Sequence, residues 1–107
     1  MVVESILLRR YASSLLGGGV KVLEKYVAEK LGNDNVWEVL VDEPSRFYNA
    51  LRSFIRDGAD AILTLIFMKC FQHGVIDVEP RKLLEDIKSG EVSSLRSVFN
   101  KKSYSTL

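Results

Sequence analysis

The sequence predicts an all-α protein, a compact bundle of five to seven short helices around a central apolar helix at about residues 58–72. Apolar residues recur at intervals of three and four along nearly the whole chain, which is the period of amphipathic helices. Glycine and proline stand at the expected helix ends rather than within the periodic segments. The one candidate strand, residues 75–78, has no second strand to pair with, so we interpret it as a loop.

Two amphipathic segments open the chain. The apolar positions of the first follow the i, i+3, i+4, i+7, i+8 rule: Leu8, Tyr11, Ala12, Leu15 and Leu16. Those of the second form one stripe: Val20, Leu23, Val27 and Leu31. Gly32 follows the second segment, and glycine commonly ends helices because it adopts the left-handed conformation at little steric cost. Residues 34–40 are expected to form a short helix with Asp34 as its N-cap.

The middle of the chain predicts two further helices joined by a tight corner. The first begins at Pro44, because proline suits the first helical position, where its missing N–H is no loss. Its apolar face is unambiguous: Phe47, Tyr48, Leu51, Phe54 and Ile55. The second has Asp57 as its expected N-cap and is apolar on almost every side from Ala59 to Phe71. A helix of that kind is buried on most sides, which places it at the centre of the bundle.

The last third of the chain predicts shorter elements. One helix begins at Pro80 and ends at Gly90, and the apolar residues Val92, Leu95 and Phe99 indicate a final short helix. Residues 1–100 are therefore expected to form a single helical domain, followed by a flexible polar tail at residues 101–107.

Composition excludes several classes of protein. The chain has 107 residues and a net charge of +1, which argues against bulk nucleic acid as a purely electrostatic partner. Its single cysteine, Cys70, cannot form an internal disulfide, which favours a reducing, cytoplasmic setting. The longest apolar stretch, residues 61–68, is too short to cross a membrane, which takes about 20 residues.

Three consecutive glycines, Gly17–Gly19, stand before a helix with Lys21 near its start, as in some nucleotide-binding loops. A dinucleotide loop needs G-x-G-x-x-G after a strand, and a P-loop needs G-x-x-x-x-G-K-[ST]. Neither pattern is present, because Val22 occupies the third glycine position of the first and the Ser or Thr position of the second. We interpret the glycines as a corner between two helices, with an anion site at the helix N-terminus as the alternative.

Several other residues are candidates for a catalytic or metal site. Cys70 and His73 lie three residues apart on one helix face, which is half of a metal site or a thiolate–imidazole pair. A buried thiol and a histidine near a helix C-terminus explain the same spacing more simply. Asp60 is explained by the helix dipole, and the adjacent Glu85 and Asp86 point in different directions. We therefore expect no catalytic residue, metal or cofactor.

A basic helix face supplies an alternative function. Arg46, Arg52 and Arg56 are expected on the polar side of one helix, where they are candidate contacts to a phosphate backbone. Further basic residues that would join them are Arg9, Arg10, Lys101 and Lys102. No recognition helix accompanies them, so an ordinary solvated face is the simpler interpretation.

The segment EPSRFYNALRSFIRDGADAILTLI, residues 43–66, resembles a motif of small archaeal all-helical domains of unassigned function. In that family a Pro-x-x-Phe-Tyr-x-x-Leu helix runs into a Gly-Ala corner and a very apolar helix. The matching residues are Pro44, Phe47, Tyr48, Leu51, Gly58 and Ala59. The upstream VLEKYVAEKLG is similar too, whereas the turn reads Ile55-Arg56-Asp57-Gly58 where the family tends to show a Phe-Gly pair. The resemblance implies an archaeal regulatory or assembly component and supplies no catalytic residues.

The function expected from these observations is non-enzymatic. A chain with a very apolar helix and no equipped cleft is predicted to act as an interaction or assembly module, a homodimer or a subunit of a small complex. The expected contact residues are Ile62, Ile66, Phe67 and Phe71, with Ile6, Leu7 and Tyr11 as a second patch. A nucleic-acid-associated regulator is the first alternative. An apolar ligand is the second, held among Tyr11, Tyr26, Phe47 and Trp37.

Overall fold

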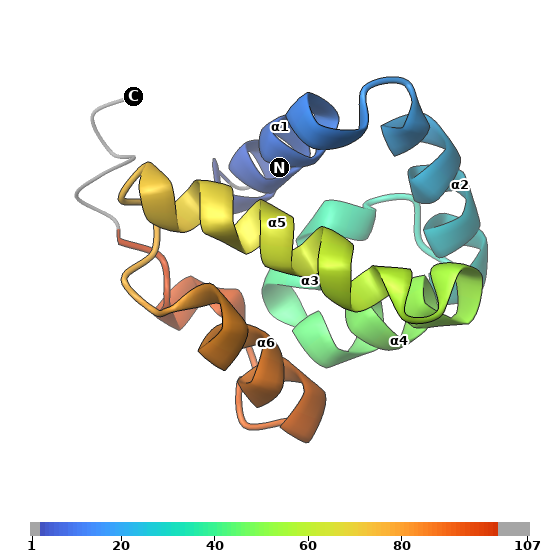
Figure 1. Ribbon diagram of the computed structural model, residues 1–107. Coiled ribbons are helices and arrows are strands. Elements are labelled where there is room, and N and C mark those ends of the chain that lie inside the picture. Colours follow the sequence, from blue (N-terminus) through green and yellow to red (C-terminus); the bar gives the residue numbers. More distant parts are fainter. Residues whose placement is uncertain (1–2, 101–107) are drawn as a thin grey trace.

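Six α-helices and one turn of 3-10 helix make up the computed structural model, which describes residues 3–100 (Figure 1). The helices are α1 (Val3–Leu16), α2 (Gly19–Leu31), α3 (Val36–Asp42), α4 (Pro44–Ile55), α5 (Gly58–Gln72) and α6 (Pro80–Ser89), and the 3-10 turn is Leu95–Ser97. This confirms the predicted all-α bundle. The predicted tail, residues 101–107, lies outside the described residues.

Helix α5 packs against α1, α4 and α6, and in Figure 1 it crosses the near face with α1 above it and α6 below. Helices α2 and α3 pack mainly on α1 and α4 instead. The buried side of α5 carries Ala59, Leu63, Ile66, Phe67 and Cys70. These three helices leave the opposite side of α5 open, so this apolar helix is less enclosed than its composition predicts.

One continuous core joins all the helices. Its largest fully buried side chains include Leu8 of α1, Leu40 of α3, Phe47 and Leu51 of α4 and Phe67 of α5. Complete burial of a Leu or Phe side chain stabilises a fold by about 1.5–3 kcal/mol. The amphipathic stripes read from the sequence supply most of this core.

The helix ends agree with the sequence at glycine and proline. Pro44 and Pro80 occupy first-turn positions, while Gly32 and Gly90 adopt the left-handed conformation at φ 69° and 80°. The predicted Asp34 cap is wrong, and the predicted Asp57 cap is right in position but not in its side-chain hydrogen bond. Residue 35 rather than Asp34 precedes α3, and Asp57 precedes α5 without its side chain capping any N–H. Aspartate near a predicted helix start is thus weaker evidence for the helix boundary than proline or glycine, which restrict or extend the backbone angles directly.

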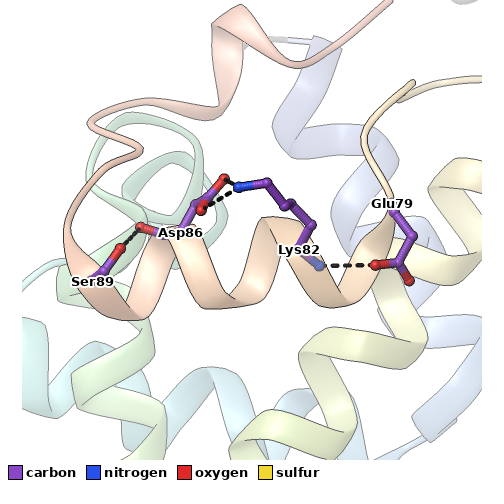
Figure 2. A network of polar contacts seen from close by, with 4 residues as sticks. All are labelled: Glu79, Lys82, Asp86 and Ser89. Carbon is purple, nitrogen blue, oxygen red and sulfur yellow. Dashed lines mark hydrogen bonds and ion pairs between the residues drawn. The ribbon is translucent and has the colours of Figure 1, made fainter.

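Helix α6 carries the side-chain cap that the sequence did not single out (Figure 2). The carboxylate of Glu79 accepts a 3.0 Å hydrogen bond from the Lys82 backbone N–H. Along the same side, Lys82 Nζ contacts both oxygens of Asp86 at 2.9 and 3.0 Å, and Ser89 Oγ donates to the Asp86 carbonyl at 3.1 Å. These contacts are solvent-exposed and local to one helix, so they support α6 rather than form a site.

The segment interpreted as a loop does find a partner. Ile76 forms an isolated antiparallel bridge with Phe99, and the Asn100 N–H donates to the Val75 carbonyl at 2.6 Å. Phe99 therefore lies in this bridge rather than in a final helix, and only Leu95–Ser97 is helical there, as a 3-10 turn. The pairing joins residues more than twenty positions apart, which local periodicity does not reveal. Between residues 3 and 100, none of the helices meets the length and apolarity that crossing a bilayer requires.

Candidate functional site

The open side of α5 is the most distinctive surface of the described chain. Leu65, Met68 and Phe71 lie on successive turns and are 46%, 41% and 45% exposed. Ala61 and Gln72 are exposed beside them. With the half-buried Thr64 they form what we call the α5 surface: Ala61, Thr64, Leu65, Met68, Phe71 and Gln72. This surface runs about three turns without an ionisable side chain.

A groove of about 310 Å³ borders the carboxyl half of this surface. The start of α6 forms its other wall, because α6 runs antiparallel to α5 and brings Glu79 and Arg81 beside Gln72. Its lining residues are Thr64, Met68, Phe71, Gln72, Glu79, Pro80 and Arg81. The groove therefore has an apolar floor and one charge of each sign at its edge.

Of the predicted contact residues, three are in the wrong place for a surface. Leu7, Ile66 and Phe67 are almost completely buried in the core, so they cannot contact a partner while the fold is intact. Ile62 is half-buried. Ile66 and Phe67 lie on the almost uniformly apolar helix α5, whose apolar residues do not by themselves distinguish the inward side from the outward side.

The remaining predicted contacts lie in different surroundings. Phe71 and Ile6 are exposed, on α5 and α1 respectively. Tyr11 is half-buried and stacks on the ring of His73, with ring centroids 5.4 Å apart. Sequence analysis missed Leu65 and Met68. The usable signal was the spacing of the small and polar residues Ala61, Thr64 and Gln72, which share their side of the helix.

Cys70 and His73 do not form a chemical pair. The thiol of Cys70 is fully buried in the core, and this burial raises its pKa to about 12. A thiol with that pKa is protonated at neutral pH, and its burial keeps it away from solvent. His73 is at the exposed end of α5, where its ring lies against Tyr11. Among residues 3–100, no group of three or more His, Cys, Asp or Glu residues is arranged to hold a metal ion.

The three glycines turn a corner between α1 and α2. Gly17 has φ 57°, a conformation that favours glycine, and its N–H donates to the Ser13 carbonyl at 2.8 Å. Gly18 has ordinary right-handed angles, and Gly19 is the first residue of α2. The segment before the corner is helix α1, so the strand that would direct a nucleotide-binding loop is absent at this point.

A polar cluster joins α1, α2 and α3. Arg9 contacts both carboxylate oxygens of Glu24, at 2.7 and 3.3 Å, and the indole N–H of Trp37 donates to the same carboxylate at 2.6 Å. Burial alone would raise the pKa of Glu24, but the hydrogen bonds from Arg9 and Trp37 outweigh it and lower the pKa. A pocket of about 190 Å³ lies beside the cluster. The ion pair from Arg9 and the hydrogen bond from Trp37 both end on Glu24, so the cluster joins three helices.

A second cluster joins α4, α5 and α6. The Tyr48 hydroxyl donates to one oxygen of Asp60 at 2.6 Å, and Lys88 Nζ donates to the other at 3.0 Å. The pKa of Asp60 is lowered, chiefly by the hydrogen bond from Tyr48 and then by Lys88. Asp60 thus acts as a connection between helices, a role that the helix-dipole interpretation missed.

The predicted basic face is not continuous. Arg46 is used within the fold, since it donates to the Leu31 carbonyl at 2.8 Å and to the Glu43 carboxylate at 3.1 Å. Arg52 is six residues further along α4, which turns it about 120° away from Arg46 around the helix axis. Arg56 lies beyond the end of α4, in the turn that leads to α5. These three residues do not form the row that tracking a phosphate backbone requires.

The aromatic residues proposed to hold an apolar ligand lie apart. Trp37 and Phe47 contact each other in the core, with ring centroids 5.5 Å apart. Tyr26 is exposed on α2 and stacks on Phe54 of α4, with ring centroids 4.2 Å apart. The predicted set therefore encloses no common cavity.

Comparison with protein-family models, with curated proteins and with solved structures finds no match to this chain.

Proposed function

We propose that this chain is a non-enzymatic interaction module, a regulatory or adaptor component, that binds another protein through the α5 surface. The observation that carries the proposal is the exposure of nearly half of the Leu65, Met68 and Phe71 side chains on successive turns of one helix. Contiguous apolar surface is unfavourable in water and usually marks an interaction site. Methionine suits such a site, because its flexible side chain adapts to the partner that covers it.

The polar residues support a non-enzymatic role. Glu24 and Asp60 have lowered pKa values, and each carboxylate accepts hydrogen bonds from two side chains of neighbouring helices. A general acid or base needs a pKa near the working pH, and a nucleophile needs access to substrate. Cys70 offers neither access nor a low pKa. These groups are suited to holding helices together.

The test uses a charged residue in the α5 surface and a matched control. Leu65→Glu should abolish binding of a hydrophobic dye such as anilinonaphthalene sulfonate, or abolish assembly if the protein is already associated. Val22→Glu is the control, because Val22 is an equally exposed apolar residue on α2. The proposal fails if the wild-type protein binds no dye, forms no assembly, and matches Leu65→Glu in both measurements.

A further inference from the structure

We propose that the partner of the α5 surface is a second copy of this chain, whose own α5 lies antiparallel across it. This inference rests on the proposed function and names the partner and its orientation. The exposed residues Ala61, Leu65, Met68 and Gln72 are spaced by four, three and four positions, which is the a/d spacing of a helix–helix seam. A twofold axis brings the same surface from both copies together, so one uncharged seam serves as both halves of the interface.

The size of the side chains along α5 favours the antiparallel orientation. The amino end of the seam carries the small Ala61, and the carboxyl end carries the larger Phe71 and Gln72. A parallel pair would place Phe71 against its own copy and leave a gap between the two alanines. An antiparallel pair places the large side chains Phe71 and Gln72 of each copy against the small Ala61 of the other. Antiparallel helix dipoles also attract, whereas parallel dipoles repel.

The charges at the two ends of α5 favour the same orientation. Arg56 and Asp57 precede its amino end, while Glu79 and Arg81 border its carboxyl end through the groove. Charges of both signs thus stand at each end, and α5 itself adds Asp60 in its first turn and Lys69 in its last. Antiparallel pairing brings the two different ends together and lets Arg56 pair with the partner's Glu79 and Asp57 with the partner's Arg81. Parallel pairing would bring each of these charges towards its own copy.

Disulfide cross-linking tests the orientation directly. Ala61→Cys and Gln72→Cys are prepared as separate proteins of different tagged size, mixed, and oxidised. The two positions are eleven residues apart, about 16 Å along the helix. A disulfide needs Cα atoms within about 7 Å. The mixed product therefore requires antiparallel helices, and the self-linked products require parallel ones. We expect the mixed species Ala61→Cys/Gln72→Cys to dominate. Self-linked species alone would overturn the antiparallel arrangement. The native Cys70 is buried and does not compete.

Charge exchange tests the proposed end contacts in solution. Arg56→Glu and Glu79→Arg should each weaken dimerisation about fivefold, since each disrupts two symmetry-related exposed ion pairs. The double variant Arg56→Glu/Glu79→Arg should recover most of the loss. Additive weakening without recovery would overturn the pairing of these ends. The fold of each variant is checked by circular dichroism.

Light scattering and dye binding together separate this inference from the proposed function. A dimer that Leu65→Glu dissociates and Val22→Glu leaves intact supports both. A monomer whose α5 surface binds dye, with the dye lost in Leu65→Glu, overturns the second copy as partner and leaves the interaction function standing. A monomer that binds no dye overturns both.

Discussion

The Tyr48 hydroxyl and the Asp60 carboxylate lie 2.6 Å apart, joining the middle of α4 to the first turn of α5. Lys88 of α6 donates to the second carboxylate oxygen. One aspartate therefore fixes three helices relative to each other, on the part of the molecule that positions the α5 surface. The tyrosine ring is almost fully buried, whereas the ion pair with Lys88 is open to solvent.

Replacing the Tyr48 hydroxyl should lower stability measurably. In Tyr48→Phe the ring still fills its place in the core, but the hydrogen bond to a charged acceptor is lost, which costs about 1–2 kcal/mol. Urea unfolding followed by circular dichroism gives the free energy of unfolding. Lys88→Met is the control, because an exposed ion pair contributes about 0–1 kcal/mol. A loss in Lys88→Met that exceeds the loss in Tyr48→Phe would contradict this assignment.

Stability should fall in acid through Asp60 and Glu24, whose pKa values are lowered in the folded protein. A carboxyl with a lower pKa when folded contributes its full stability above its unfolded pKa of about 4 and loses it as the pH falls through the folded value. These two groups therefore predict a constant free energy of unfolding from pH 7 to about 5 and a decrease below about 4. Tyr48→Phe should show a weaker acid dependence. An equal dependence in both proteins would contradict the role of Tyr48.

The fluorescence of Trp37 can be used to follow the cluster around Glu24, because Trp37 is the only tryptophan in the chain. Glu24→Leu should cost about 1–3 kcal/mol, since the nearly buried indole N–H loses its acceptor. Glu24→Gln retains an acceptor oxygen and should cost less. Unfolding followed by Trp37 fluorescence measures both. Equal losses would show that the charge pairing with Arg9 matters more than the indole hydrogen bond.

Cys70 should resist thiol reagents in the native protein, because burial keeps the thiol protonated and out of reach. Ellman's reagent at pH 8 is expected to label it only as fast as the helices around it open, and immediately in urea. Val22→Cys is the positive control, since Val22 is exposed on α2, outside the α5 surface. Rapid labelling of native Cys70 would mean that the carboxyl end of α5 is not packed as described.

The sequence predicts the features that are set by residues close together in the chain better than those set by contacts between distant segments. Helix periodicity and the proline and glycine ends are local, so α4 and α6 could be located within a residue or two. The bridge between Ile76 and Phe99 depends on distant segments, and the local pattern marked only one side of it, residues 75–78. The exposed side of α5 was missed for a related reason. Its inward face is decided by where three other helices pack, and in a helix that is apolar on both sides only the spacing of Ala61, Thr64 and Gln72 indicates that choice.

Arg56 is the one non-glycine residue with positive φ between residues 3 and 100, at φ 56° and ψ −125°. A side chain at this positive φ, outside the left-handed helical region, is strained by about 1–3 kcal/mol, and glycine is not. The greater freedom of glycine in the unfolded chain opposes this gain by about 0.5–1 kcal/mol. The relief of strain is larger, so Arg56→Gly should stabilise the monomer by about 0.5–2 kcal/mol. Arg52→Gly, within the regular helix α4, should instead destabilise it by about 1 kcal/mol.

The same variant should act oppositely on association. Arg56→Gly removes one side of the proposed contact to the partner's Glu79, so a more stable protomer should dimerise less well. Backbone strain is retained where a side chain is needed elsewhere, and a gain in unfolding free energy together with a weaker dimer is the expected signature. Urea unfolding at low concentration gives the first quantity, and sedimentation equilibrium gives the second. A variant that gains stability with unchanged dimerisation would remove Arg56 from the interface and leave its strained backbone without a function there.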